Sequence, residues 1–129
     1  MKKDSKVKSG ETPAKVEEKE IQWLGNSLDD LKAFPEEARK NAGFELGNVQ
    51  AGLTPEKAKP YTTIGSGIQE LVIDSKDGWN RVMYVAKFPE AVYVLHAFEK
   101  RTNKISRPDQ EMLEKRYKDM LAVRAALKK

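Results

Sequence analysis

The sequence predicts an α+β domain in which a small antiparallel β-sheet is joined by an N-terminal helical hairpin and a C-terminal helix. Apolar residues recur at helical spacing before residue 53, three short apolar runs separated by turn residues lie between residues 68 and 98, and an amphipathic stretch follows residue 106. We expect the helices to pack on one face of the sheet. A chain of 129 residues can bury one hydrophobic core.

The N-terminal half predicts a strand followed by helices. A short strand candidate covers residues 20–24, and a helical pattern follows over residues 27–52. Pro35 suits the first position of a new helix, so this pattern predicts either a helical hairpin or one kinked helix. Ser27 is the expected N-cap, with Asp30 in the capping-box position. Gly43 and Gly47 inside the pattern would permit the helix to pack closely against a sheet.

The C-terminal half predicts three strands and a helix. A connector over residues 53–66 leads to strand candidates at 68–74, 79–88 and 91–98. Their connections are too short for helical crossovers, so the strands should form an antiparallel meander. The third strand is apolar on both faces and should be central and covered on both sides. The last helix begins near residue 106, where a serine can cap it.

The composition excludes several classes of protein. The chain has no cysteine and one histidine, so disulfides, thiolate metal sites and sites with several histidines are excluded. We expect no metal and no cofactor. No apolar run approaches the ~18–20 residues that span a bilayer, and no apolar stretch follows the N-terminal lysines. We expect a cytoplasmic protein without membrane contact, with a disordered tail over residues 1–18 and one domain over residues 19–129.

Positive charge is concentrated at the exit of the third strand. Residues 100–107 contain Lys100, Arg101, Lys104 and Arg107 and no carboxylate. Such a cluster predicts a patch that binds phosphate groups. A solvated basic loop without a ligand is the alternative reading.

Two further residues could belong to a site at this patch. Arg81 lies in the second predicted strand, and sheet pairing would bring it to the same surface as Lys100. Alternatively, Arg81 is exposed at an edge and pairs with Asp74 or Asp77. His96 is either a hydrogen-bonded structural residue or a member of the site, because strand alternation places it on the face of Lys100.

Aromatic side chains near the patch have two readings as well. Tyr84, Phe98 and Trp79 could stack on unpaired bases. They would fit the hydrophobic core equally well.

Several segments resemble a known family. They are RVMY (81–84) and AVYVLHAFEKRT (91–102), together with IQWLG (21–25), AKP (58–60) and EL (70–71). These segments are similar to the phage-derived toxins of the RelE/ParE toxin superfamily, which include HigB-like members. Arg101 stands where the family usually has the second lysine of a pair, which keeps the charge but changes its geometry.

The resemblance implies the fold of RelE/ParE-like toxins and the toxin role in a type II toxin–antitoxin system. Such toxins resemble metal-independent, ribosome-dependent mRNA endoribonucleases, so the implied partners are mRNA, the ribosome and a helix-turn-helix antitoxin. The implied catalytic residues are Arg81, Lys100, Arg101 and His96. The implied RNA contacts are Tyr84, Phe98, Lys59, Lys104 and Arg107.

Other readings stay open at this point. In a metal-free ribonuclease the 2′-hydroxyl attacks, cations stabilise the phosphate, and protons must be shuttled. His96 or Lys100 is the expected general base, and Lys100 would need a pKa lowered from its usual value of about 10.4 by crowded cations. The superfamily also includes ParE-like toxins that bind DNA gyrase. A non-catalytic nucleic-acid-binding module is a third reading.

Overall fold

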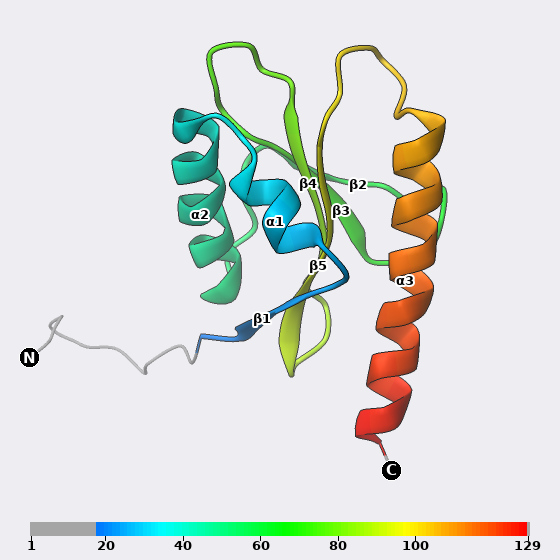
Figure 1. The fold of residues 1–129 in the computed structure, drawn as a ribbon. Coiled ribbons are helices and arrows are strands. Elements are labelled where there is room, and N and C mark those ends of the chain that lie inside the picture. The colour runs from blue at the N-terminus through cyan, green and yellow to red at the C-terminus, as the bar shows by residue number, and fades with distance from the viewer. Residues whose placement is uncertain (1–17, 129) are drawn as a thin grey trace, which may run out of the picture.

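One five-stranded sheet organises the protein, in the order β1-β5-β4-β3-β2 (Figure 1). This computed structural model describes residues 18–128, so nearly all of the tail expected over residues 1–18 lies outside the described residues. The strands are β1 (Glu20–Trp23), β2 (Ala58–Pro60), β3 (Ile68–Val72), β4 (Asn80–Val85) and β5 (Ala91–Glu99). The helices are α1 (Ser27–Lys32), α2 (Glu36–Gln50) and α3 (Arg107–Leu127).

The predicted antiparallel meander is confirmed for the three strands β3, β4 and β5. The complete sheet is mixed, because β1 pairs with β5 in parallel, with Glu20 opposite Ala91. The sequence gives no local signal for that pairing, since the partners lie far apart in the chain. A short strand, β2, lies within the expected connector and pairs with β3 at one edge of the sheet.

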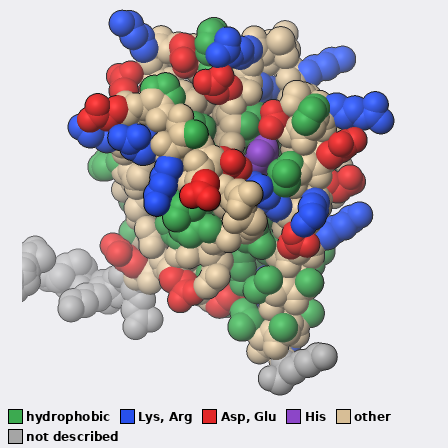
Figure 2. Space-filling model, in the orientation of Figure 1, with side chains coloured by type: hydrophobic (Ala, Val, Ile, Leu, Met, Phe, Trp, Pro, Cys, Tyr) green, Lys and Arg blue, Asp and Glu red, His purple; other side chains and the backbone are tan. Residues whose placement is uncertain are grey.

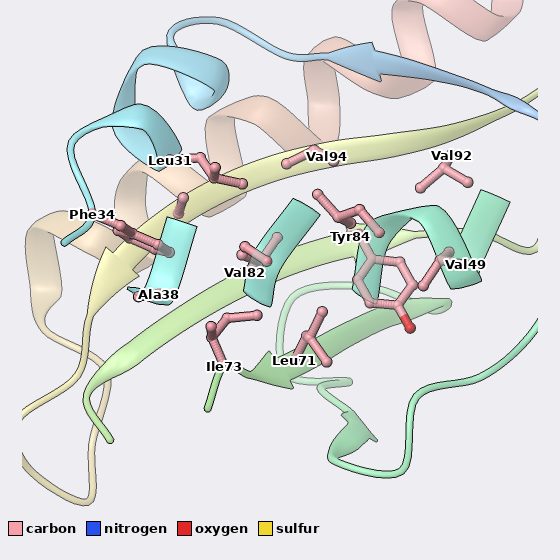
Figure 3. Close-up of a cluster of buried hydrophobic side chains, with 13 residues drawn as sticks. Leu31, Phe34, Ala38, Val49, Leu71, Ile73, Val82, Tyr84, Val92 and Val94 are labelled. Atoms are coloured by element: carbon pink, nitrogen blue, oxygen red, sulfur yellow. The ribbon is translucent and has the colours of Figure 1, made fainter. Parts of the chain in front are cut away.

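The helices cover both faces of the sheet, so the expectation that they share one face is wrong. The predicted hairpin is two helices, α1 and α2, which pack with one set of sheet residues into a core that includes Leu71, Val82 and Val94 (Figure 3). Helix α3 packs on the opposite face, against residues that include Met83 and Leu95 (Figure 1). As predicted, β5 is apolar on both faces, and all of its residues except the last are buried. Each face of the sheet therefore needs a helix to cover it.

Two local expectations for the first helices are also wrong. Asn26, rather than Ser27, stands at the N-cap, and the buried Ser27 hydroxyl donates to the Val94 carbonyl at 3.1 Å. A Cβ atom at Gly43 or Gly47 would meet nothing within 4 Å, so neither glycine serves packing against the sheet. The expected cap of α3 is confirmed, because the Ser106 side chain accepts a hydrogen bond from the Asp109 amide.

An irregularity in β5 decides which side chains face α3. Met83 pairs with His96 and Tyr84 pairs with Val94, so Leu95 is an extra residue in the ladder. At a bulge of this kind the strict alternation of faces is interrupted. Leu95 packs in the core beneath α3, and His96 bonds to residues of α3. The C-terminal half of β5 is thereby turned so that Phe98 also lies on the α3 face.

Arg124, in the C-terminal half of α3, holds this helix to the β4–β5 turn. Arg124 Nε bonds to Glu90 Oε2 at 2.6 Å, and the Arg124 guanidinium lies 3.4 Å from the Phe88 ring centroid. The Tyr93 hydroxyl donates to the same carboxylate at 2.7 Å. Hydrogen bonding from Arg124 lowers the pKa of Glu90 from its ordinary 4.5 to about 2. Burial raises the pKa of Tyr93 to about 12.

The Arg124–Glu90 pair predicts that the free energy of unfolding decreases over a defined acidic pH range. Because the pKa of Glu90 is depressed in the folded protein, its contribution to stability is present above about pH 4.5 and is lost as the pH falls towards about 2. Glu90→Gln should therefore flatten the decrease in the free energy of unfolding over that range, measured by urea denaturation. Glu111→Gln, which removes one end of an exposed pair with Arg107, should leave the decrease unchanged. Identical pH profiles for wild type and Glu90→Gln would contradict the prediction.

Candidate functional site

Two cations meet at one buried carboxylate on the α3 face of the sheet. Lys100 Nζ lies 3.0 Å and Arg81 Nε 3.4 Å from Glu70 Oε2. The Glu70 side chain is 3% exposed, and those of Arg81 and Lys100 are 16% and 14% exposed. We call these three residues the Glu70 cluster. They come from β3, β4 and the residue after β5, which sheet pairing brings side by side.

The sequence predicted that Arg81 and Lys100 share a surface, and the structure brings them together. It did not predict Glu70. The partners considered for Arg81 are wrong, because Asp74 pairs with Lys57 and Asp77 accepts from the Trp79 amide at 2.9 Å. A single acidic residue within the apolar run of residues 68–73 was the available signal, because a buried carboxylate requires a partner.

Arg81 is fixed in place but keeps hydrogen-bonding capacity. Its Nη1 donates to the carbonyls of Gly78 at 2.7 Å and Asn80 at 3.1 Å. Its Nε is buried and faces Glu70 without a geometrically good hydrogen bond. Within residues 18–128 no hydrogen bond involves Nη2, so this end of the guanidinium can bind an anion.

His96 belongs to a neighbouring polar network. Its Nε2 lies 2.8 Å from Asp109 Oδ1, and its Nδ1 lies 3.2 Å from Arg116 Nη1. Because a guanidinium only donates, Nδ1 must accept this bond. Arg116 is buried and also bonds to the Leu95 carbonyl at 3.1 Å and to Asp30 at 3.2 Å. In Figure 2 the histidine, coloured purple, lies in a crevice beside acidic side chains.

Phe98 separates His96 from the Glu70 cluster. The ring of Phe98 stacks on the imidazole of His96, with centroids 5.1 Å apart and planes at 16°. In the ladder Phe98 is paired with Arg81. Phe98 is buried, so its contacts are with protein groups rather than with solvent. Its position favours a packing role between the two polar groups.

The remaining predicted cations lie on the surface around this end of the sheet. Arg101 is exposed and bonds to Glu99 at 2.9 Å, with its guanidinium 4.0 Å from the Trp79 ring centroid. Lys104 is exposed and, with Lys100, Arg101 and others between Glu99 and Asp109, lines a surface hollow of about 530 Å³. Arg107 is exposed and pairs with Glu111 at 3.3 Å. Lys59 is exposed on the edge strand β2, in register with Glu70.

Tyr84 does not lie with these residues. It is buried on the opposite face of the sheet, in the core formed with α2 (Figure 3). Burial, with a smaller effect of Glu45, raises the pKa of Tyr84 to about 12. Of its two readings, the core position is the one that the structure shows.

The described part of the chain contains neither a candidate metal site nor a candidate membrane-spanning helix. Among residues 18–128, no three His, Asp or Glu side chains are arranged so that they could hold a metal ion. In the same range, no helix has the length and apolar character needed to cross a membrane.

The fold and the site define a small α+β protein that gathers cations around one buried carboxylate. The family described as phage derived protein Gp49-like (DUF891) matches residues 29–118. The chain therefore belongs to this Gp49-like family, which is known as a family of RelE-like toxins. The match includes the whole Glu70 cluster and the His96 network. No curated protein matches the chain.

The burial of the cluster predicts its effect on stability. Glu70→Ala leaves Arg81 and Lys100 largely buried without their carboxylate, and should reduce the free energy of unfolding by about 3–5 kcal/mol. Glu99→Ala removes an exposed carboxylate from the neighbouring strand end and should cost less than about 1 kcal/mol. Urea denaturation at neutral pH measures both. Equal effects of the two substitutions would mean that Glu70 does not hold the cations.

Proposed function

We propose that the protein is a HigB-like toxin of a type II toxin–antitoxin system, and that it cuts mRNA on the ribosome without a metal. The observation that carries the proposal is the meeting of Arg81 and Lys100 at Glu70, with cationic hydrogen-bonding capacity left over. Membership of a RelE-like toxin family supports the toxin role. The residues of AVYVLHAFEKRT support the finer assignment by resemblance.

The proposed reaction uses the nucleophile that RNA carries. The 2′-oxygen forms a bond to the neighbouring phosphorus while the bond from phosphorus to the 5′-oxygen breaks, which leaves a 2′,3′-cyclic phosphate and a 5′-hydroxyl. The transition state carries additional negative charge on the phosphate oxygens. Arg81 Nη2 and the Lys100 ammonium are positioned by Glu70 to stabilise that charge.

Proton transfer is assigned to Glu70 and Lys100. Both nitrogens of His96 already have partners, and Phe98 lies between His96 and the cluster. The contacts of Glu70 within residues 18–128 use Oε2, so Oε1 is the oxygen that can accept the 2′-hydroxyl proton. Lys100 donates a proton to the departing 5′-oxygen. In this proposal the Glu70 carboxyl then rotates, so that its protonated oxygen takes the position that Oε2 holds 3.0 Å from Lys100 Nζ, and the proton returns to Lys100, which restores both groups.

The surface cations bind the rest of the RNA in this proposal. Arg101, Lys104 and Arg107 lie on the loop after β5 and at the start of α3, Lys59 lies on the edge strand β2 opposite Glu70, and all four are exposed. Contacts of this kind neutralise phosphates and position the strand without reading its sequence. The ribosome supplies the mRNA, and a helix-turn-helix antitoxin is the proposed inhibitor. Both partners are carried over from the family resemblance.

Expression without an antitoxin should arrest growth and translation. Primer extension on a translated reporter should find cuts within codons, and the same reporter without a start codon should stay intact. Arrest with intact mRNA and inhibited gyrase supercoiling would favour a ParE-like toxin. Binding of RNA with neither arrest nor cleavage would favour a non-catalytic module.

Substitutions of Arg81 and Lys100 should have non-additive effects on the cleavage rate. In a ribosome-dependent cleavage assay, Arg81→Ala and Lys100→Ala should each lower the rate about a hundredfold, because a well-placed donor contributes roughly 3–4 kcal/mol to the transition state. The double variant should lose less than the product of the two effects. Lys40→Ala is the control, since this exposed cation lies on α2, which packs on the opposite face of the sheet, and should change the rate less than about threefold.

Stability must be measured alongside these rates. The side chains of Arg81 and Lys100 are mostly buried, so their removal should also lower the free energy of unfolding. Rates are therefore compared at a temperature where circular dichroism shows every variant folded. Normal cleavage by folded Arg81→Ala would make the arginine structural.

A further inference from the structure

Trp79 is a large aromatic residue that the fold uses only through its backbone. Its amide donates to Asp77 at 2.9 Å, and its carbonyl accepts from the Lys100 amide at 2.8 Å. The indole is half-buried and belongs to neither hydrophobic core. The first bond lies in the β3–β4 turn and the second continues the β4–β5 ladder, and both could be made by any residue other than proline. The folded chain therefore gives no packing reason for a tryptophan.

One face of the indole is covered by a cation on a neighbouring loop. The Arg101 guanidinium lies 4.0 Å from the ring centroid. Its other partner is the exposed carboxylate of Glu99, at 2.9 Å, and the Arg101 side chain is itself 60% exposed. A planar, exposed cation held by these two contacts can be replaced by another planar group.

The backbone at Trp79 is bonded to the residues of the proposed reaction. Arg81 Nη1 bonds to the carbonyl of Gly78, the residue before Trp79, and the Lys100 amide bonds to Trp79 itself. The β3–β4 turn and the loop that follows β5 rise at the same end of the sheet (Figure 1). A phosphate held by Arg81 and Lys100 therefore has a flat aromatic surface next to it.

We infer that Trp79 is a nucleobase-binding subsite, on which an unpaired base stacks in the place that the Arg101 guanidinium occupies. The inference rests on the proposed function, because it identifies the substrate as a single strand whose base beside the reacting phosphate is unstacked. Aromatic rings bind bases of single strands in this way with little dependence on sequence. Arg101, once displaced, remains close enough to contact a phosphate.

The experiment uses Trp79 as its own reporter. The chain has two tryptophans, so Trp23→Phe leaves Trp79 as the single source of indole fluorescence. The probe is a single-stranded 2′-O-methyl RNA hexamer, which lacks the 2′-hydroxyl nucleophile and cannot be cut. The matched probe is an abasic hexamer with the same phosphates. The base-containing hexamer should quench Trp79 fluorescence, and the abasic hexamer should bind without quenching it.

A substitution separates base stacking from phosphate binding. Trp79→Leu should lower affinity for the base-containing hexamer about tenfold and leave affinity for the abasic hexamer within about twofold, measured by anisotropy of a labelled probe. Trp79→Phe should recover part of the loss, and thermal melting should show both variants as stable as wild type.

Three results would overturn the inference: binding without quenching, equal affinity of Trp79→Leu for the base-containing hexamer, or no binding of either hexamer by the wild type. All three leave the proposed nuclease intact, because the ribosome supplies its mRNA and cleavage is tested separately. Quenching with the expected loss in Trp79→Leu, together with no mRNA cleavage, would keep the nucleobase subsite and reject the proposed nuclease.

Discussion

One extra residue in the interior strand β5 determines on which face of the sheet the side chains after it lie. Leu95 has no partner in the β4–β5 ladder, and both Leu95 and His96 interact beneath α3. Regular alternation from Tyr93 would place His96 and Phe98 on the α1 and α2 face, away from Arg81. The bulge reverses this for the last third of the strand. The carbonyl of Leu95 is bonded by the buried Arg116, which helps to hold the irregular backbone in place.

Arg116 illustrates how a buried charge is accommodated. Its guanidinium bonds through Nη1 to a main-chain oxygen, to Asp30 of α1 and to His96 of β5, and the Asp30 carboxylate compensates its charge. The contacts reach from α3 past the end of β1 to α1, and so connect the two helical layers beyond the edge of the sheet. Gly25 makes room for this, since a Cβ atom there would lie 2.8 Å from Arg116 Nε and its φ is +55°.

The His96 network and the Glu70 cluster, both beneath α3, differ in which hydrogen-bonding atoms lack a partner. In the His96 network, the imidazole has a partner at each nitrogen and the guanidinium has three. In the Glu70 cluster, two cations share one carboxylate oxygen and retain donors directed elsewhere. A histidine whose two nitrogens are both bonded has no nitrogen left to accept a proton from a ligand, whereas a cation with free donors can bind an anion. This difference supports the proposal that Arg81 and Lys100, rather than His96, act on the RNA.

The sequence alone determined the class of fold and the helices and strands other than β2, because apolar periodicity and turn residues act over a few neighbours. The meander of β3 to β5, the helical pair, the Ser106 cap and the shared surface of Arg81 and Lys100 all follow from such local patterns. Only the tertiary structure decided the parallel β1–β5 pair, the placement of helices on both faces, the bulge at Leu95, and the location of Tyr84 in the core. It also decided that Glu70 joins the two cations and that Arg101 covers Trp79. Most of these features depend on contacts between residues that are distant in the chain. The bulge is a one-residue irregularity that composition and periodicity do not reveal, and it changes the face of every side chain after it in the strand.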